Sequence, residues 1–440
     1  MQRDILSRRR HHERGQTIIL VAISLVSLLA MAALAIDIVT LYSARSEIQR
    51  AADAAALVGA KALADSGITT LLLTDPNFTT VQSWATTAAT NQINAVLQNN
   101  LVSGQAPTLL SAPVDWNRQG NPHITVSLQS SNLPSFFSKI WGGAGTVVTA
   151  TATAEAYNPA NVQNFTPIAP KAVKPWLVAN ADPLNSGAQF ITPTTGAVET
   201  GVIGEQFYLK SDCQTTDFTK CSTLIDAVFG VSGTSTAGHP QVDYVPAKVT
   251  APSTPNPNVC PACAGSTDYE QSIECADVTT SYTVLSCGGG ATNLQWDNGV
   301  NPGGAGGLSA LGAECLIHAT AAGNNKGQDT LNPGPWPTSP MQITAESGPQ
   351  SGNLVTNSSS IVTIPIIDTA GIPATGGNVT IDGYMQAFIN EVRGGANQAD
   401  IKVTVLNIAG CSNSSTNSGA TPVVGGSGTS PVPVRLITPP

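Results

Sequence analysis

The sequence predicts an α+β protein that begins with a transmembrane helix and ends in a predominantly β region. Three observations support this fold class. Residues 17–36 carry no charge, residues 37–65 continue as an alanine-rich helical pattern, and short β-type segments alternate with Gly-, Pro- and Ser/Thr-rich turns over the rest of the 440 residues. Only 11% of the residues are charged, against roughly 25% in typical soluble domains.

The uncharged run at residues 17–36 is the predicted membrane span. Its 20 residues, TIILVAISLVSLLAMAALAI, form a helix about 30 Å long, which matches the hydrocarbon thickness of a bilayer. The basic tail 1–16 should stay in the cytoplasm by the positive-inside rule. The chain after Asp37 is then expected outside. The arginines that set this orientation are Arg8, Arg9, Arg10 and Arg14.

Two processing alternatives exist for this segment. The first alternative is that the run is the apolar part of a secretory signal cleaved at Ala30-Met31-Ala32, although it is longer than the usual length of about 7–15 residues. Prepilin-type cleavage after Gly15 is the second alternative. Leu20 stands where prepilins typically carry Glu, which disfavours it.

Residues 37–65 are expected to extend the membrane helix outward as one rod. Alanine dominates the segment and has the highest helix propensity. A stripe of small residues at steps of three or four allows close packing. The stripe therefore packs either on a partner helix or on the chain's own external domain. Asp37, at the outer membrane edge, either pairs with a partner or is solvated.

The N-terminal segment resembles a known family. Residues 13–63 are similar to the N-terminal segment of TadG-like proteins of the Tad (Flp) pilus-assembly system, most distinctively at 49–57, QRAADAAAL. The other residues that carry the resemblance are Arg14-Gly15-Gln16, Ala35-Ile36-Asp37, Tyr42 and Arg45.

The resemblance implies a bacterial inner-membrane protein with its bulk in the periplasm, which helps to assemble or anchor Flp pili. Its expected partners are the lipid bilayer and other pilus-assembly or pilin membrane helices, in a homo- or hetero-oligomer. The residues expected to contact partner helices are Asp37, Tyr42, Arg45, Gln49, Ala52 and Asp53.

The external chain divides into a small α+β domain (66–157), a Pro-rich linker (158–175), a β-rich domain (176–411) and a low-complexity tail (412–440). Pro365 predicts that its strand lies at a sheet edge or ends there. The Phe-rich helix at 132–141 belongs either to the core or to the membrane surface. In the small domain we expect helices at 79–101 and 132–141 and strands at 123–128 and 146–157; in the β-rich domain we expect strands at 201–209, 243–249, 281–285, 360–368, 378–389 and 400–408.

All eight cysteines follow residue 200, in the part expected outside the membrane. An even number in an oxidising compartment favours disulfides, with Cys213 and Cys221 as a local pair. The Cys260–Cys263 CxxC leaves zinc binding and redox chemistry as alternatives. The remaining cysteines are Cys275, Cys287, Cys315 and Cys411.

Charge and motifs favour a structural protein. The net charge of −9 disfavours binding to nucleic acid, and the HExxH, GxSxG and P-loop signatures are missing from the sequence. Glu314 and His318 would share a face if their segment were helical. We predict no enzyme activity, no catalytic or metal-binding residue and no cofactor. The alternative to a membrane anchor is a minor pilin or surface adhesin exported after processing.

Overall fold

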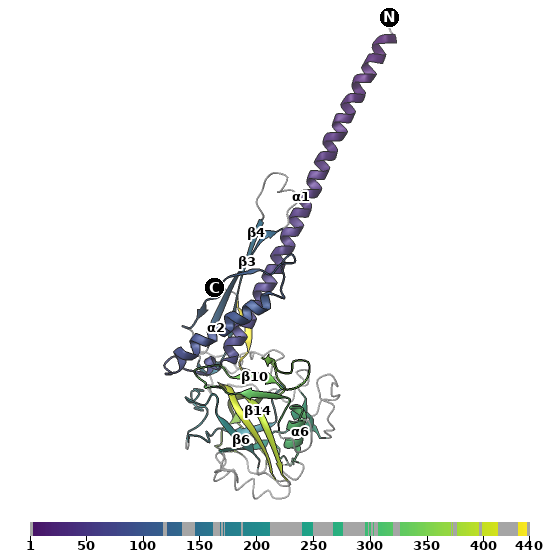
Figure 1. Ribbon diagram of the computed structural model, residues 1–440. Coiled ribbons are helices and arrows are strands. Elements are labelled where there is room, and N and C mark those ends of the chain that lie inside the picture. The colour runs from purple at the N-terminus through teal and green to yellow at the C-terminus, as the bar shows by residue number, and fades with distance from the viewer. Residues whose placement is uncertain are drawn as a thin grey trace.

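The computed structural model shows one long helix that leads into two packed domains (Figure 1). The helix–sheet domain contains the end of this helix, residues 66–157 and the C-terminal strand, and the barrel domain contains residues 172–411. The structure describes residues 3–117, 121–133, 146–161, 168, 170, 172–185, 188–211, 240–249, 267–275, 295–297, 299–300, 302, 307–319, 326–370, 372, 376–395, 398–411 and 430–437.

Helix α1 (Arg3–Asp65) is continuous over 63 residues, which confirms the prediction of a single rod. It ends just before Gly67, whose φ of 78° is the left-handed conformation that glycine adopts without a steric penalty. A 3-10 turn, η1 (Ile68–Thr70), leads to helix α2 (Phe78–Leu97). Helix α2 confirms the helix expected at 79–101 and buries one side, at Val81, Ala85, Ala89, Ile93 and Leu97.

An antiparallel sheet forms the other layer of the helix–sheet domain. Its strands lie in the order β1-β3-β4-β16, and β2 pairs with β3 beside β1. Strand β3 extends to Leu133, so the helix expected to begin at Asn132 is wrong at its start, and residues 134–145 lie outside the described residues. The strands are β1 (Thr108–Ser111), β2 (Val114–Asp115), β3 (His123–Leu133), β4 (Thr146–Ala156) and β16 (Val434–Ile437).

Strand β16 comes from the segment expected to be a low-complexity tail. It pairs antiparallel with β4, from Val434 opposite Ala156 to Ile437 opposite Thr153. The chain therefore returns from the barrel domain to complete the sheet of the first domain. Residues 412–429 of the predicted tail lie outside the described residues.

The barrel domain is built around a closed barrel with the strand order β12-β14-β15-β6-β7-β5. Aliphatic side chains such as Val178, Ile364 and Val403 fill its core. Five of the six strands expected in this domain correspond to barrel strands, and 281–285 lies outside the described residues. The barrel strands are β5 (Trp176–Ala179), β6 (Gln206–Lys210), β7 (Gln241–Pro246), β12 (Ile361–Ile367), β14 (Ile381–Gly395) and β15 (Gln398–Gly410).

The prediction of an edge or terminating strand at Pro365 is wrong. Strand β12 continues to Ile367 and has β14 on one side and β5 on the other. The carbonyls of Thr363 and Ile367 accept hydrogen bonds from the β5 side, so the proline nitrogen faces that side as well. Pairing with that side is interrupted between Thr363 and Ile366, and the missing N–H therefore costs no ladder bond.

Short elements surround the barrel. One small sheet has the order β11-β10-β9 and another pairs β13 with β8. The described ends of the expected linker 158–175 are packed, since Asn158 and Lys174 are buried. The elements are η2 (Pro159–Asn161), α5 (Asp268–Glu274), α6 (Leu308–Leu316), β8 (Gln295–Trp296), β9 (Asp329–Asn332), β10 (Gln342–Ala345), β11 (Leu354–Val355) and β13 (Gly377–Asn378).

Candidate functional site

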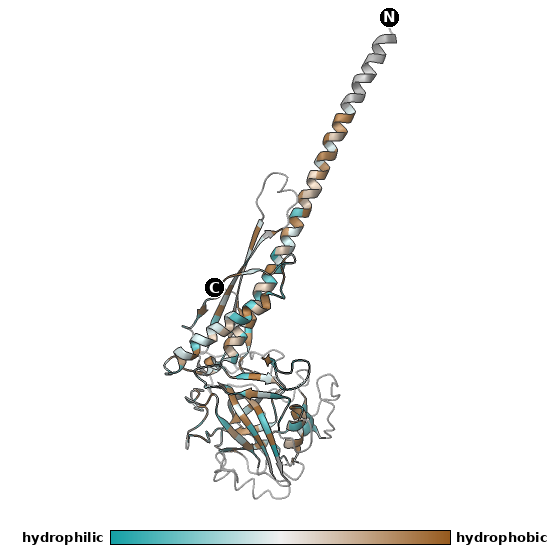
Figure 2. Ribbon diagram, viewed as in Figure 1, coloured by the Kyte–Doolittle hydropathy of each residue, from teal (hydrophilic) through white to brown (hydrophobic). Residues whose placement is uncertain are grey.

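Helix α1 has two halves with different surroundings. From Ile18 to Ile36 its apolar side chains project from the molecule, with Ile18 70% and Leu28 67% exposed, and Figure 2 shows this free, mostly hydrophobic stretch beyond the domains. Among the described residues, α1 is the one helix long and apolar enough to cross a membrane. Ser24 and Ser27 donate hydrogen bonds to carbonyls one turn back, at 2.9 and 2.8 Å, so their hydroxyls are satisfied without water.

The second half of α1 is part of a hydrophobic core. Ala44, Ile48 and Ala52 are buried together with Val126 and Ala152, from β3 and β4. Small side chains let the helix lie close to the sheet, as they do between helices. For this face the structure shows packing on the chain's own domain, one of the two arrangements that the sequence left open.

The residues expected to contact partner helices fall into two groups. Ala52 is fully buried against the chain's own sheet and Asp37 is only 8% exposed; the assignment of Ala52 to a partner contact is therefore wrong in this structure. Tyr42 is 78% exposed, and Arg45 and Gln49 are also exposed.

The remaining residue of the predicted contact set is Asp53, and the residues predicted to set the membrane orientation are four arginines of the N-terminal tail. Asp53 is half-buried and accepts a hydrogen bond of 2.9 Å from Nε2 of Gln49. The side chains of Arg8, Arg9, Arg10 and Arg14 lie outside the described residues.

A cleft lies where the end of α1 meets the barrel domain. It has a volume of about 620 Å³ and is formed by α1, α2, β9–β11 and the barrel strands β12, β14 and β15. Apolar side chains, including Val58, Trp84, Ile343 and Val355, make much of its wall. The polar groups that line it include Lys61, Asp65, Gln92, Gln342 and Gln386.

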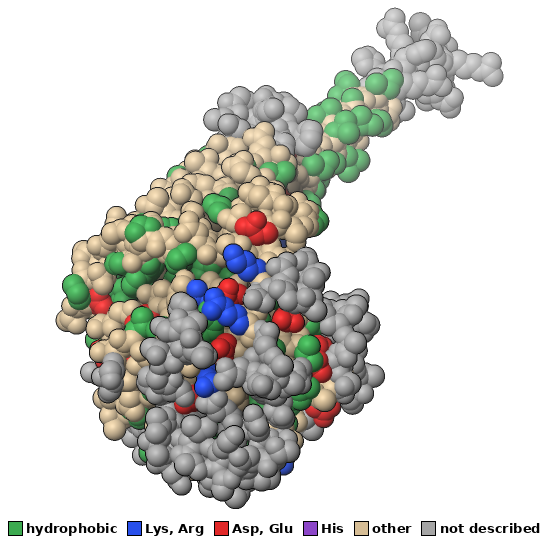
Figure 3. Space-filling view, turned by 60° about the horizontal axis from the view of Figure 1, so that its bottom comes forward, with side chains coloured by type: hydrophobic (Ala, Val, Ile, Leu, Met, Phe, Trp, Pro, Cys, Tyr) green, Lys and Arg blue, Asp and Glu red, His purple; other side chains and the backbone are tan. Residues whose placement is uncertain are grey.

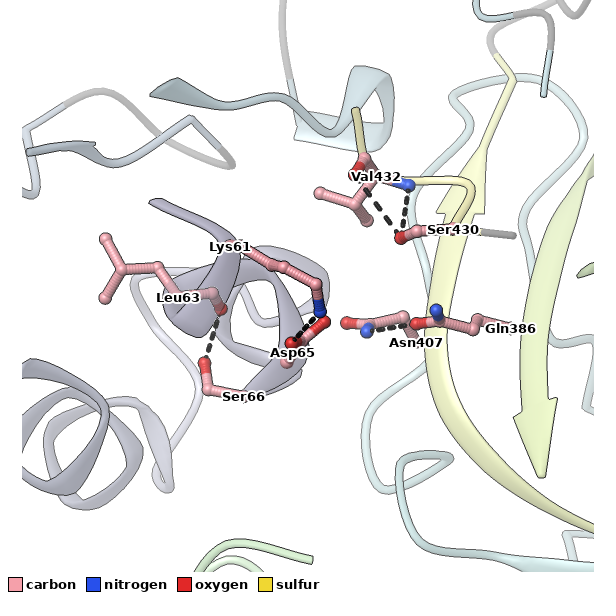
Figure 4. A network of polar contacts seen from close by, with 8 residues as sticks. All are labelled: Lys61, Leu63, Asp65, Ser66, Gln386, Asn407, Ser430 and Val432. Carbon is pink, nitrogen blue, oxygen red and sulfur yellow. Dashed lines mark hydrogen bonds and ion pairs between the residues drawn. The ribbon is translucent and has the colours of Figure 1, made fainter. Parts of the chain in front are cut away.

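The inner end of this cleft holds a polar network (Figure 4). Lys61 and Asp65 form an ion pair one helical turn apart. Asn407, on β15, donates a 2.8 Å hydrogen bond from Nδ2 to Oε1 of Gln386, on β14. The side chain of Asn407 points toward the ion pair in Figure 4, and its Oδ1 is buried without a hydrogen-bond partner.

Asp65 lines the cleft, and 37% of its side chain is exposed. Burial raises its pKa, and the neighbouring Lys61 ammonium opposes this shift. The cleft thus offers apolar walls, one ion pair and several side-chain amides to a ligand. A pocket that combines apolar walls with a few polar groups suits a ligand that presents both apolar and polar atoms.

Hydrogen bonds across the two domains hold the cleft in shape. Nε1 of Trp84 on α2 donates to the carbonyl of Pro337 at 2.8 Å. The hydroxyl oxygen of Thr70 lies 3.2 Å from both the backbone nitrogen and the carbonyl oxygen of Ile408. Nδ2 of Asn158 donates a hydrogen bond of 2.9 Å to the same carbonyl oxygen. The helix–sheet domain is therefore attached to the barrel domain at more than one place, through α2, η1 and the segment that follows β4.

The outer face of the barrel carries charges of both signs. Arg393, Asp400 and Lys210 are successive partners across β14, β15 and β6, and the next partner, Asp243 on β7, is buried. Figure 3 shows acidic and basic side chains side by side on the visible face of this domain. Alternating signs favour pairing within the sheet and do not form a one-sign surface for a charged partner.

Sequence reasoning missed a buried lysine in the expected linker. Nζ of Lys174 donates hydrogen bonds to the carbonyls of Ile273 and Cys275, at 2.6 and 2.9 Å, where α5 ends. Burial lowers the pKa of Lys174 to about 7, and the nearby Glu274 opposes this shift. The sequence signal for this burial is that the lysine has only nonpolar neighbours, Val173 before it and Pro175–Trp176 after it.

Among the described residues, the other candidates for catalysis or metal binding do not come together in a site. Helix α6 ends at Leu316 and His318 has a φ of 54°, so Glu314 and His318 do not share a helix face. Among the described residues, no group of three His, Cys, Asp or Glu side chains is placed to hold a metal. The expectation that the chain has no enzyme activity and binds no cofactor stays a prediction.

The cysteines are only partly described. Cys275, Cys315 and Cys411 are buried, and none of the described cysteines is a free thiol. No disulfide pair is defined within the described part of the chain, so the disulfide framework stays a prediction. The CxxC and the other cysteines, Cys213, Cys221, Cys260, Cys263 and Cys287, lie outside the described residues.

Comparison with known families identifies the class of this helix. Residues 15–62 match the Tad family, described as Flp pilus-assembly TadE/G-like. The chain therefore carries a Tad-type segment, and the resemblance to TadG-like proteins is confirmed over α1. No curated protein and no solved structure matches the chain.

Proposed function

We propose that this chain is a single-pass inner-membrane structural protein of Tad (Flp) pilus assembly, which anchors or docks components of the machinery. The observation that carries the proposal is the coincidence of the Tad match, residues 15–62, with a helix that is first exposed and apolar and then part of a domain core. Such a helix links a membrane position rigidly to a folded domain.

The orientation follows from charge. The N-terminal arginines Arg8, Arg9, Arg10 and Arg14 stay in the cytoplasm, so the two domains lie in the periplasm. That compartment is oxidising, which supports disulfides among the cysteines of the barrel domain. Partner helices would meet residues 17–36 within the bilayer or the exposed Arg45 and Gln49 outside it.

A complementation experiment tests this function. A host strain lacking the protein receives either the full chain or a form in which a cleavable signal peptide replaces residues 1–36, and surface Flp pili are counted by electron microscopy. Only the full chain should restore pili, because the released domain has no attachment to the membrane. Restoration by the released form would refute the anchoring role, and normal pili in the deletion strain would refute the assembly role.

The minor-pilin or adhesin alternative predicts a different mature chain. Intact-mass measurement of the protein from membranes should show an N-terminus at Met1 or Gln2 if the helix is an anchor. A mature chain that begins after Gly15 or Ala32 would support the exported alternative.

A further inference from the structure

The exposed apolar surface of α1 does not stop at the predicted end of the span, Ile36. Ile38, Val39 and Tyr42 are 57%, 68% and 78% exposed, while Asp37 is turned inward and 8% exposed. From Ile18 to Tyr42 the surface is about 36 Å long at 1.5 Å per residue, which exceeds the roughly 30 Å of a bilayer core.

The first charged side chain on this exposed face is Arg45. A tyrosine followed within one turn by an arginine suits the boundary between lipid and water. The tyrosine ring lies at the headgroup level, and the arginine extends its charge outward. The outer boundary of the bilayer therefore falls near Tyr42 and not at Ile36.

The β3–β4 hairpin reaches the same level. Nε2 of Gln49 is 3.5 Å from the carbonyl oxygen of Thr151, and Ala64 packs near Ala156, so β4 runs along α1, as Figure 1 shows. Because the two elements advance in the same direction, Thr146 at the start of β4 lies toward the apolar half of α1. Five residues of strand cover about 17 Å, which equals about 11 residues of helix. Counted back from Gln49, Thr146 lies near Ile38.

The described upper part of the hairpin carries no charge. Between His123 and Glu155, at the barrel end, every described residue of β3 and β4 is uncharged. Val148 faces the core, while Val147 is 49% exposed on the other face. Serine, threonine and valine can enter the headgroup layer without the cost of burying an ion.

We propose that the start of β4, at Thr146 and Val147, and the α1 face from Ile36 to Tyr42 form one lipid-contact surface in the outer headgroup layer. The helix–sheet domain then sits on the bilayer and not at the end of a free stalk. The occupant is lipid because this surface continues the exposed apolar face of the span without a break. The inference rests on the proposed membrane anchoring.

Depth-dependent quenching tests this surface. An environment-sensitive fluorescent amino acid is placed in the full chain at Val147, and the protein is reconstituted in vesicles of phosphatidylethanolamine and phosphatidylglycerol. The lipids carry either a headgroup nitroxide or bromines deep in the acyl chains. Leu25, in the span, and Leu354, 63% exposed on the barrel domain, serve as the deep and the aqueous controls.

We expect the probe at Val147 to lose fluorescence with the headgroup nitroxide, the probe at Leu25 to lose it with deep bromines, and the probe at Leu354 to lose it with neither. Quenching at Leu25 with none at Val147 would overturn the inference and leave the anchor intact. No quenching at Leu25 would overturn the anchoring itself. Protection of Val147 together with a crosslink from it to a second protein would show a protein partner in place of lipid and would also overturn the inference.

Discussion

Gly59 allows α1 to approach α2 and β3 closely, and this contact predicts a specific coupling. A Cβ at this position would lie 2.9 Å from the Cδ1 atoms of both Ile93 and Ile124. Gly59→Ala gains about 1 kcal/mol of helix propensity, while overpacking costs about 1–3 kcal/mol. The net loss of unfolding free energy is thus about 0–2 kcal/mol.

A double-mutant cycle separates the two effects. Ile93→Val removes the Cδ1 atom and alone costs about 0.5–1.5 kcal/mol. Because it also removes one of the two clashing atoms, Gly59→Ala should be better tolerated by about 1 kcal/mol in that background. The measurement is urea unfolding of the full chain in mild detergent, followed by far-UV circular dichroism.

The matched control for this cycle is Ile48→Val, on the same helix three turns away. At that distance substitutions add independently, so Gly59→Ala with Ile48→Val should show no coupling. Additivity in the Ile93 cycle to within about 0.3–0.5 kcal/mol would refute the close contact of α1 with α2.

Three further perturbations test the barrel domain and its junction. Between about pH 7 and 10.5 the unfolded chain carries a proton on Lys174 that the folded chain lacks, because burial lowers the pKa of this lysine. Stability should therefore rise with pH in this window, and Lys174→Met should remove that slope in unfolding titrations; an unchanged slope would count against the buried amine. Burial and the neighbouring Asp182 raise the pKa of Glu205 from 4.5 to about 7, so stability should fall as pH rises across this range, and a Glu205→Gln variant that keeps the same fall would contradict the assignment. Trp84→Phe loses the hydrogen bond to the Pro337 carbonyl and should cost about 0.5–1.5 kcal/mol with faster amide exchange at the junction, whereas unchanged exchange would place the junction's stability elsewhere.

The helix and most barrel strands could be predicted from the sequence because their signals are local. An uncharged run of bilayer length, an alanine-rich continuation and alternating β segments need no knowledge of distant partners. The small-residue stripe through Ala52 showed that something packs closely there. Periodicity alone does not say whether the partner is another chain or a sheet formed later in the same chain.

The features that were missed depend on contacts between distant residues. Strand β16 is short, and Val434 pairs with Ala156, across most of the chain. Pro365 fits inside the barrel because β5 does not pair with β12 at that position. The residues next to Pro365 in the sequence do not show where β5 begins. Lys174 is buried because the end of α5 supplies two carbonyls to its ammonium, and these carbonyls lie about a hundred residues further on in the sequence.

The most direct test of the account is a photo-crosslinking measurement on α1 in native membranes. A diazirine amino acid replaces Ile48, which is 1% exposed, and in a second variant it replaces the exposed Arg45; crosslinked peptides are identified by mass spectrometry. If α1 passes from the membrane into the core of its own domain, Ile48 should crosslink within the chain to peptides of β3 or β4, and Arg45 should not. Crosslinks from Ile48 mainly to another protein would show that this half of α1 packs on a partner helix, and would contradict the account.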